Sequence, residues 1–358
     1  MKYLAIITVY GEYNFGNKLQ NYATVSFFKK HGYTVDTLQV YQSALIPTYK
    51  DYLKDVIKNF ISLFPIRTKF RNQRLRKQKF VQFSKNYLNL TRRFFTRDIN
   101  EDLFQKYDAL IVGSDQVWND HDFNIDDVNY YTLKNIKDSK KVSFAASIGK
   151  DSFRIEYEKY FKEGLSDFDF ISCRESNGVQ YLNNLLKRTC MQIFDPTLFL
   201  SAEEWETIIK KPSWLHKENY VLLYFLGETN DKARAHLDND IANINIMDIR
   251  AESYNTSPEE FLYLIANADE ILTDSFHACV FSMLFGKTFT VFEKKSKEQN
   301  NKMESRIRSL FSFFRIEAEF GVKVTSKNYS EFNKIRNDKS NEYEKIIMKA
   351  LRDFRYDK

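Results

Sequence analysis

The segment ILTDSFHACVFSMLFGKTFTVF, Ile271 to Phe292, carries the pattern that decides the fold. An apolar strand-like run leads into a polar turn, an apolar helical stretch follows, and Gly286 precedes a second strand-like run. Strand, turn, helix and strand in this order form the unit from which parallel sheets are built. The turn holds Asp274, Ser275 and His277. One interpretation is that these residues only cap and accompany the helix, and the other is that they form one wall of an active site.

The same alternation recurs along the chain. Strand-like runs include KYLAIITVY near the start, DALIVGSDQVW at 108–118, KKVSFAASIG at 140–149 and NYVLLYFLG at 219–227. Helical patterns lie between them, such as SPEEFLYLIANA, where Ser257 is the expected cap and Pro258 the first helical residue. These consecutive units predict an α/β fold of two Rossmann-like, doubly wound domains that face each other across a cleft.

A break near Ser201 separates the two series, because SAEEWETIIKK opens with a serine and two acids, as a helix start should. We expect an N-terminal Rossmann-like domain over residues 1–200, a C-terminal one over 201–340 and a closing helix over 341–358. Within the first domain we expect a basic helical insertion near residues 51–98.

The composition is that of a globular protein with room for two cores. The chain has 358 residues, of which 43% are hydrophobic and 28% charged. Its three cysteines have no paired spacing, which argues against a disulfide framework or a zinc knuckle and predicts a reducing compartment. The start lacks the features of a signal peptide, and no run reaches the roughly 18 apolar residues of a spanning helix. We therefore expect a soluble, cytoplasmic protein.

The net charge of +6 is unevenly spread. No acidic residue lies between Asp55 and Asp98, while Lys and Arg recur with interleaved Phe, most densely in RTKFRNQRLRKQKF at 67–80. Such a segment is typical of a helix that lies on an anionic membrane surface or contacts phosphates. The alternative is a solvated helix whose aromatic side chains pack on the domain. Nucleic-acid binding has less support, because no recognised motif accompanies the charge.

Polar residues gather where the expected strands end. In open parallel sheets, ligands bind at the carboxyl ends of the strands. The residues at such ends are Asn14, Gly16 and Asn17 after the first strand, Ser114 and Asp115 after a later one, then Ser147, Arg174 and Glu175, and in the second half Asp274, Ser275 and His277. Strand ends of both halves are thus expected to present polar groups to one gap between the domains.

Each member of this set also has a structural interpretation. NFGNKLQN lacks the GxGxxG fingerprint of dinucleotide binding, although a helix N-terminus there is suited to an anion. The alternative is a turn glycine with an asparagine cap. Arg174 either pairs with its neighbouring acid or clamps a carboxylate or phosphate. Asp115 either caps the following turn or orients a sugar hydroxyl.

His277 is the one histidine of the chain's five in such a strand-end turn. Histidine ordinarily titrates near neutral pH, so it both takes and returns a proton, and Asp274 is a candidate to orient the ring. A serine hydrolase or a zinc enzyme has little support, since no Ser-His-Asp elbow, HExxH motif or Cys/His cluster is present.

An ordered set of motifs resembles the polysaccharide pyruvyl transferase family. From about Asn14 to Phe292 the motifs are FGNKLQNYA, VGSDQVWN, VSFAASIG, SCRESNGV, FDPTLFLSAEEW and EFLYLIANADEILTDSFHACVFSMLFGKTF, and SRIRSLF at 305–311 is similar to the family's late arginine-bearing segment. The resemblance implies a glycosyltransferase-B-like fold. It also implies transfer of the pyruvyl group of phosphoenolpyruvate to two hydroxyls of one sugar, which forms a cyclic ketal on a surface polysaccharide, an exopolysaccharide or its precursor.

The resemblance also implies roles for individual residues. His277 takes the acid/base role, Arg174 holds the carboxylate or phosphate, Asp115 lies on the acceptor side and Arg306 is a further phosphate ligand. The scheme requires no metal and no cofactor, with phosphoenolpyruvate as the donor substrate. In one departure Ala278 stands where the family commonly has glycine, which removes the freedom to adopt positive φ.

The partners expected from this scheme are phosphoenolpyruvate and a sugar or lipid-linked oligosaccharide acceptor, with peripheral contact at the inner membrane surface and no nucleic acid. Two alternatives remain open. One is a glycosyltransferase of the same architecture that uses a nucleotide sugar, and the other is a non-catalytic carbohydrate-binding relative.

Overall fold

The computed structural model describes residues 2–9, 14–41, 68–216, 218–228, 231–240, 245–249, 255–294 and 302–352. The chain divides into two compact units, which are described here one at a time. The first unit comprises Met1–Leu53, Ser84–Phe199 and Lys339–Lys358, and the second comprises Lys54–Phe83 and Leu200–Asp338. Each unit is therefore assembled from separate stretches of sequence.

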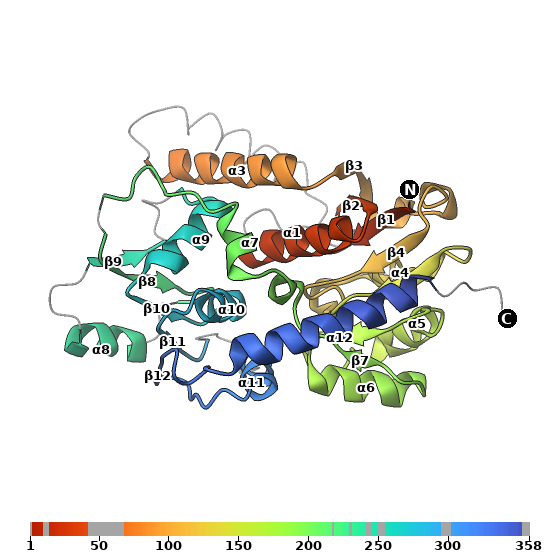
Figure 1. Cartoon of the computed structure of the whole chain (residues 1–358). Coiled ribbons are helices and arrows are strands. Elements are labelled where there is room, and N and C mark those ends of the chain that lie inside the picture. Colours follow the sequence, from red (N-terminus) through yellow and green to blue (C-terminus); the bar gives the residue numbers. More distant parts are fainter. Residues whose placement is uncertain are drawn as a thin grey trace. The chain divides into compact units, whose positions relative to one another are not determined.

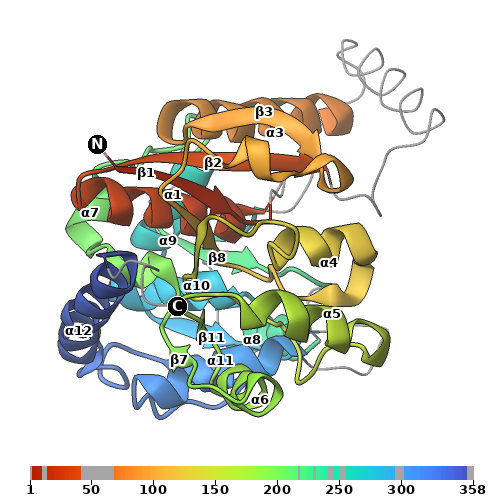
Figure 2. The same ribbon diagram turned by 90° about the vertical axis from the view of Figure 1, so that its right-hand side faces the viewer.

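A five-stranded parallel sheet forms the centre of the first unit. Its strands are β1 (Lys2–Ile7), β2 (Tyr33–Tyr41), β3 (Leu90–Phe95), β4 (Ala109–Val112) and β5 (Lys140–Ser143), in the order β3-β2-β1-β4-β5. Figure 2 shows β3, β2 and β1 side by side, with α1 along them. Strand β4, ALIV, is buried at every position, as expected for a parallel strand covered on both faces.

Helices and short elements of the first unit follow the strands in alternation. They are α1 (Phe15–Lys30), α4 (Ile125–Tyr131), α5 (Ile155–Ser166) and α6 (Ser176–Leu186), the 3-10 turns η2 (Thr96–Asp98), η3 (Glu101–Leu103), η4 (Asp120–Asp122) and η5 (Pro196–Phe199), and the two-stranded parallel sheet of β6 (Ser172–Cys173) and β7 (Met191–Gln192). Asn124 and Asp127 form a capping box that starts α4.

The second unit has its own five-stranded sheet. Its strands are β8 (Tyr220–Tyr224), β9 (Asn245–Asp248), β10 (Glu270–Thr273), β11 (Phe289–Val291) and β12 (Lys323–Val324), in the order β12-β11-β10-β8-β9, parallel except for β12. Its helices are α7 (Ala202–Glu206), α8 (Asp231–Asp240), α9 (Pro258–Asn267), α10 (Phe276–Leu284) and α11 (Lys302–Phe313) (Figure 1). Two further helices, α3 (Thr68–Tyr87) and α12 (Phe332–Arg352), each contribute residues to both units.

The predicted fold class is confirmed, because two doubly wound α/β units with parallel sheets account for the described chain. Strand order in the first sheet is that of a Rossmann fold, with crossovers on either side of β1. Ser257 caps α9 with Pro258 in its first turn, as its sequence predicts.

The basic segment was expected within the first domain, but Lys54–Phe83 belong to the second unit. Two boundaries also differ from the expectation. The prediction of a helical insertion near 51–98 is wrong at 90–95, where LTRRFF forms edge strand β3. Threonine and phenylalanine suit a pleated, half-buried strand, and the surrounding cations masked that signal. Residues 51–67 lie outside the described part of the chain. The closing helix begins at Phe332 rather than near 341. Its first turns, NKIRNDKSN at 333–341, are almost entirely polar, so they give no apolar helical pattern in the sequence.

Part of the basic segment packs as an ordinary helix. Phe80 and Phe83 of α3 are buried, whereas Arg71 is exposed. This is the arrangement expected of a solvated helix whose aromatic side chains pack on the domain. Lys79 donates to both carboxylate oxygens of Glu260 at 2.7 Å. In the described ranges no helix combines the length and apolarity needed to cross a membrane.

Candidate functional site

Polar residues at the carboxyl edge of the first sheet are joined by hydrogen bonds. Asn14 caps α1 by accepting from the backbone N–H of Asn17 at 3.2 Å. The Asn17 side chain donates from Nδ2 to Asp115 Oδ2 at 3.1 Å and also to the carbonyl of Val9. Gly16 is the second residue of α1 and is buried. The start of the first helix is thus tied to the loop that follows β4.

The loop after β4 has an unusual backbone. Gly113 has a φ of +126°, and a side chain there would overlap the carbonyl of Phe144, so glycine is required. The Gly113–Ser114 peptide bond is cis. Ser114 Oγ donates to the carbonyl of Ala145 at 3.1 Å, which ties this loop to the residues after β5.

Asp115 lies in the left-handed region, with a φ of +66°. Its Oδ1 accepts from the backbone N–H of Gln116 at 2.9 Å, and its carbonyl accepts from the N–H of Ser147 at 3.0 Å. The carboxylate therefore caps the following turn through one oxygen while the other accepts from Asn17. The structure thus contains the turn cap that is one interpretation of Asp115. The capping carboxylate also lies among the polar residues at the strand ends.

Arg174 lies between two carboxylates in the interior of the first unit. Its Nε donates to Glu175 Oε1 at 3.3 Å and its Nη1 bonds to Asp195 Oδ2. Asp195 Oδ1 in turn accepts from the backbone and the hydroxyl of Thr197 at 3.0 and 2.7 Å. Ser147 Oγ donates to the same Glu175 oxygen at 2.6 Å. The arginine fork is consequently held in a fixed plane by groups from two successive strand ends.

The charges around Arg174 decide its ionisation. Burial acts to lower the pKa of the Arg174 guanidinium, but the carboxylates of Asp195, Glu175 and Asp115 outweigh burial and raise it. Cys173 is buried beside Glu175, and burial raises the pKa of this thiol well above its ordinary value. The site thus keeps a permanent cation, and the nearby cysteine is a neutral thiol rather than a nucleophile.

In the second unit, the predicted residues meet at the junction of β10 and α10. Asp274 accepts from the backbone N–H groups of Leu226 and Gly227 at 2.6 and 3.1 Å. Ser275 is the N-cap of α10 and accepts from the N–H of Ala278 at 3.4 Å. These bonds fix the turn and tie it to the loop after β8.

His277 is the second residue of α10 and is 9% exposed. Its ring meets Phe276 edge to face at 5.3 Å. Arg306 lies in α11, a helix that contacts α10, and is 7% exposed. The structure thus gathers the predicted residues into two groups. Asn14, Gly16, Asn17, Ser114, Asp115, Ser147 and Arg174 belong to the first unit, and Asp274, Ser275, His277 and Arg306 belong to the second.

Sequence analysis missed three buried members of the first group. Asp195 pairs with Arg174. Gln20 donates to the Thr8 hydroxyl oxygen at 3.1 Å, and the Thr8 hydroxyl donates to the carbonyl of Ser114 at 3.0 Å. Asp195 comes three residues after the last residue of β7 and immediately before Pro196, so it too follows a strand. In the described ranges, no group of three or more His, Cys, Asp or Glu side chains is placed to hold a metal ion.

The chain matches the family model for polysaccharide pyruvyl transferase over residues 14–296. It therefore belongs to the polysaccharide pyruvyl transferase family, as its motifs predict. No curated protein matches the chain.

Among solved structures, the UDP-GlcNAc 2-epimerase of Neisseria meningitidis bound to UDP-GlcNAc is 12% identical, with 98% of this chain and 99% of that chain covered and a TM-score of 0.42. MurG of Acinetobacter baumannii is 9% identical, with 98% and 100% covered and a TM-score of 0.43. An α-glucosyltransferase in complex with UDP and a 13-mer DNA is 10% identical, with 98% and 99% covered and a TM-score of 0.47.

Proposed function

We propose that this protein transfers the pyruvyl group of phosphoenolpyruvate to a pair of hydroxyls on one sugar and forms a cyclic ketal in surface or exopolysaccharide synthesis. The family match over residues 14–296 carries the proposal, since that range includes every candidate site residue except Arg306. The hydrogen-bonded strand ends of the first unit support it, because polar groups at this edge of a parallel sheet are where ligands bind.

The reaction needs one proton gained and two lost. Protonation of the enol methylene turns it into the methyl group and leaves C2 electrophilic. One sugar hydroxyl bonds to C2, the bond from C2 to the phosphate oxygen breaks, and the second hydroxyl closes the ketal. Of the two hydroxyl protons released, one balances the proton added to the methyl carbon and the other leaves with phosphate.

His277 is the group proposed to move these protons. An imidazole can serve in turn as acid to the methylene and base to a hydroxyl. Its place in the first turn of α10 is fixed by the Ser275 cap and by the two backbone bonds to Asp274. Asp274 and Ser275 act in this proposal as binding and positioning residues around the histidine.

Charged groups are assigned to the donor and the acceptor. Arg174 holds the carboxylate or phosphate of phosphoenolpyruvate, and its two carboxylate partners keep the guanidinium plane fixed. Arg306 is a further phosphate ligand. Asp115 lies on the acceptor side, where a carboxylate accepts from a sugar hydroxyl. Asn14, Gly16, Asn17, Ser114 and Ser147 form the surrounding binding surface.

Acceptor-dependent turnover tests the proposal. Purified protein is incubated with phosphoenolpyruvate and a panel of lipid-linked or nitrophenyl glycosides, and phosphate release and product mass are followed. The expected result is phosphate release only with a suitable acceptor, together with a product heavier by one pyruvyl ketal. Transfer from a nucleotide sugar without use of phosphoenolpyruvate would contradict the proposal and favour the glycosyltransferase alternative. Glycoside binding with neither turnover would favour the non-catalytic relative.

A peripheral membrane location on the cytoplasmic side is part of the proposal. Helix α3 carries Arg71, Arg74, Arg76 and Lys77 and has no acidic residue. A polybasic helix binds anionic lipid. Such contact would bring the enzyme to acceptors carried on lipid.

A further inference from the structure

A polar stripe runs along the side of α1 that packs on the first sheet. It consists of Asn17, Gln20, Asn21 and Thr24, all at most 3% exposed. A helix that covers a sheet ordinarily buries apolar side chains there, and a buried polar group is costly unless it is hydrogen-bonded. The partners of these side chains therefore show what the stripe holds in place.

The amide group of Asn17 faces two acceptors. Its Nδ2 donates to Asp115 Oδ2 at 3.1 Å and to the main-chain carbonyl of Val9. A carboxylate and a carbonyl only accept, so the amide nitrogen, rather than the amide oxygen, must point toward them. An amide nitrogen has two hydrogens, and these two bonds use both. Because the residue is only 3% exposed, Asn17 acts mainly on Asp115 rather than on a ligand.

The next two residues of the stripe have different partners. Gln20 donates to the hydroxyl oxygen of Thr8, and that hydroxyl donates to the carbonyl of Ser114 at 3.0 Å. This chain of bonds braces the peptide that precedes Asp115. Asn21 instead accepts from the Thr37 hydroxyl of β2 at 3.2 Å. Asn21 is thus a buried amide of the same helix whose bond serves a neighbouring strand and not the loop after β4.

The carboxylate of Asp115 is held between the loop and the helix. Val117 and Trp118 are fully buried and anchor the loop, whereas Asp115 is half-buried and remains accessible to a ligand. Its Oδ1 accepts from the Gln116 N–H at 2.9 Å, and its Oδ2 accepts from Asn17. Each carboxylate oxygen accepts up to two hydrogen bonds, so both oxygens retain the capacity to accept from a hydroxyl.

We propose that Asn17 is a positioning residue that orients the Asp115 carboxylate toward a hydroxyl of the acceptor sugar. The Gln116 N–H holds one oxygen from within the loop and Asn17 holds the other from α1, so two separate segments set the plane of the carboxylate. The identity of the ligand as the acceptor sugar rests on the proposed function, whereas the positioning of Asp115 stands on these bonds alone.

Hydrogen exchange of the full-length protein, followed by mass spectrometry, tests the positioning without any substrate. Asn17→Ala removes one of the two donors to the carboxylate. We expect amide exchange in the loop at 113–119 to become about tenfold faster or more, the effect of one hydrogen bond to a charged group. Asn21→Ala is the matched control and is expected to leave exchange in this loop unchanged. Unchanged loop exchange in Asn17→Ala would overturn the inference.

Steady-state kinetics with a nitrophenyl glycoside as acceptor test the role in the reaction. A misplaced carboxylate binds the acceptor hydroxyl less well, so we expect Asn17→Ala to raise the acceptor KM about three- to tenfold and to leave the KM for phosphoenolpyruvate constant. Asn21→Ala is expected to keep both KM values. A purely structural role would reduce the active fraction and hence kcat with both KM values unchanged, and this result in Asn17→Ala would overturn the inference.

Asn17→Asp adds a pH signature. Two adjacent carboxylates share a proton, so the new carboxyl group donates to Asp115 only at low pH. Arg174, with Glu175 and Asp195 beside it, also acts on Asp115, but these groups are common to the variant and the wild-type protein. We expect the ratio of variant to wild-type kcat/KM for the acceptor to increase as the pH falls from about 8 to about 5. A ratio that does not change with pH would contradict the role of the hydrogen bond.

The two kinds of measurement separate this inference from the proposed function. Faster loop exchange in Asn17→Ala, in a protein that transfers no pyruvyl group to any acceptor, would support the positioning of Asp115 and count against the proposed reaction. Pyruvyl transfer with an acceptor KM that Asn17→Ala leaves unchanged would overturn the inference alone.

Discussion

The Ser147 hydroxyl donates to Glu175 Oε1 at 2.6 Å, and the same oxygen accepts from Arg174 Nε at 3.3 Å. A serine after one strand thereby holds the carboxylate that fixes an arginine after another. The two groups belong to the same unit, and the bond is buried.

Ser147→Ala is expected to destabilise the protein. A hydrogen bond to a buried charged group contributes about 1.5–3 kcal/mol, and alanine offers Glu175 no donor. Urea unfolding measures the loss. Ser166→Ala is the control, since the Ser166 hydroxyl makes an exposed bond of 2.7 Å to the carbonyl of Lys162. Equal losses in the two variants would contradict a special role for the buried bond.

Arg174→Lys is expected to raise the KM for phosphoenolpyruvate about tenfold or more, because an ammonium keeps the charge but loses the two-pronged fork. Steady-state kinetics over a range of donor concentrations measure this change. Arg336→Lys makes the same exchange at a buried arginine of the second unit that donates to the carbonyl of Leu200 at 3.1 Å. It is expected to lower stability without changing KM. A donor KM that stays constant in Arg174→Lys would remove the anion-binding role.

His277→Ala is expected to reduce turnover by at least ~10²-fold, the scale of general acid/base catalysis. The change is read from kcat at saturating phosphoenolpyruvate, with circular dichroism to verify folding. His236→Ala is the matched variant, because His236 lies in the same unit and contacts Glu270 at 3.3 Å. It is expected to retain turnover. Full activity of His277→Ala would exclude the acid/base assignment.

Tyr343 gives the protein a stability component that disappears at alkaline pH. Burial raises the pKa of Tyr343 to about 12, whereas the unfolded chain ionises near the ordinary value of 10.0. The folded state therefore holds the proton more tightly, so this contribution is fully present below about pH 10 and is lost as the pH rises through 12. Between about pH 10 and pH 12, the unfolding free energy of the Tyr343→Phe variant is expected to fall by roughly 2 kcal/mol less than that of the wild-type protein. Urea unfolding at a series of pH values compares the slopes, and identical slopes would contradict the assignment.

Charge reversal at Arg71, Arg74, Arg76 and Lys77 is expected to abolish binding to vesicles that contain anionic lipid, measured by co-sedimentation. Each cation near an anionic membrane surface contributes about 1 kcal/mol to the free energy of membrane binding. Reversing four of them therefore removes more than enough of that free energy to prevent binding. Lys79 is left intact because it pairs with Glu260. The control reverses Lys345 and Lys349, two exposed cations of α12. Equal sedimentation of all three proteins would remove the membrane proposal.

Local patterns of the sequence predicted the alternation of most strands and helices, but not β3, α4, α5, α11 or β12. They also singled out several residues of the first-unit group. Asn14, Asp115 and Ser147 each follow a strand, and parallel strands bring their carboxyl ends to one edge. Asp195 escaped notice because its importance depends on contact with Arg174, which is 21 residues away in the chain. Strand β3 was hidden within a run of cations whose pattern favoured a helix.

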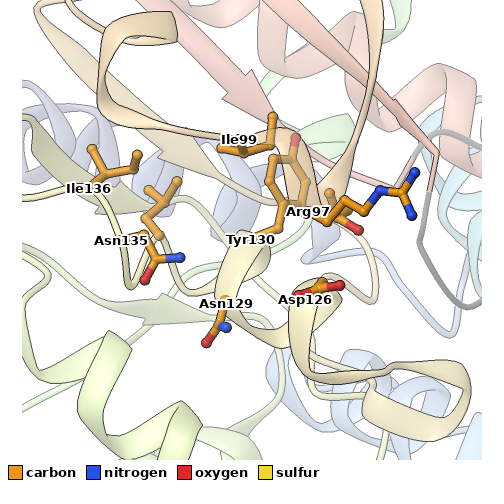
Figure 3. Close-up of a pocket in the computed structure, with 9 residues that line it drawn as sticks. Arg97, Ile99, Asp126, Asn129, Tyr130, Asn135 and Ile136 are labelled. Atoms are coloured by element: carbon orange, nitrogen blue, oxygen red, sulfur yellow. The ribbon is translucent and has the colours of Figure 1, made fainter.

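A small pocket beside α4 (Figure 3) has no sequence signal. Its lining extends from Thr96 to Ile136, and Tyr130 and Asn129 resemble ordinary residues of a short helix. Only tertiary packing buries the Tyr130 hydroxyl and Asn129 Oδ1 away from hydrogen-bond partners. Features of this kind depend on the convergence of separate segments and have no periodicity to detect.

Helix α12 has a consequence for biosynthesis. Its last part belongs to the first unit, where Tyr343 packs edge to face on Phe194 at 5.2 Å and Glu344 lies 2.9 Å from His31. When only residues 1–199 have left the ribosome, the part of α12 that belongs to this unit has therefore not yet been synthesised. The first unit therefore lacks the Tyr343 contact of Phe194 until residue 343 has also been synthesised.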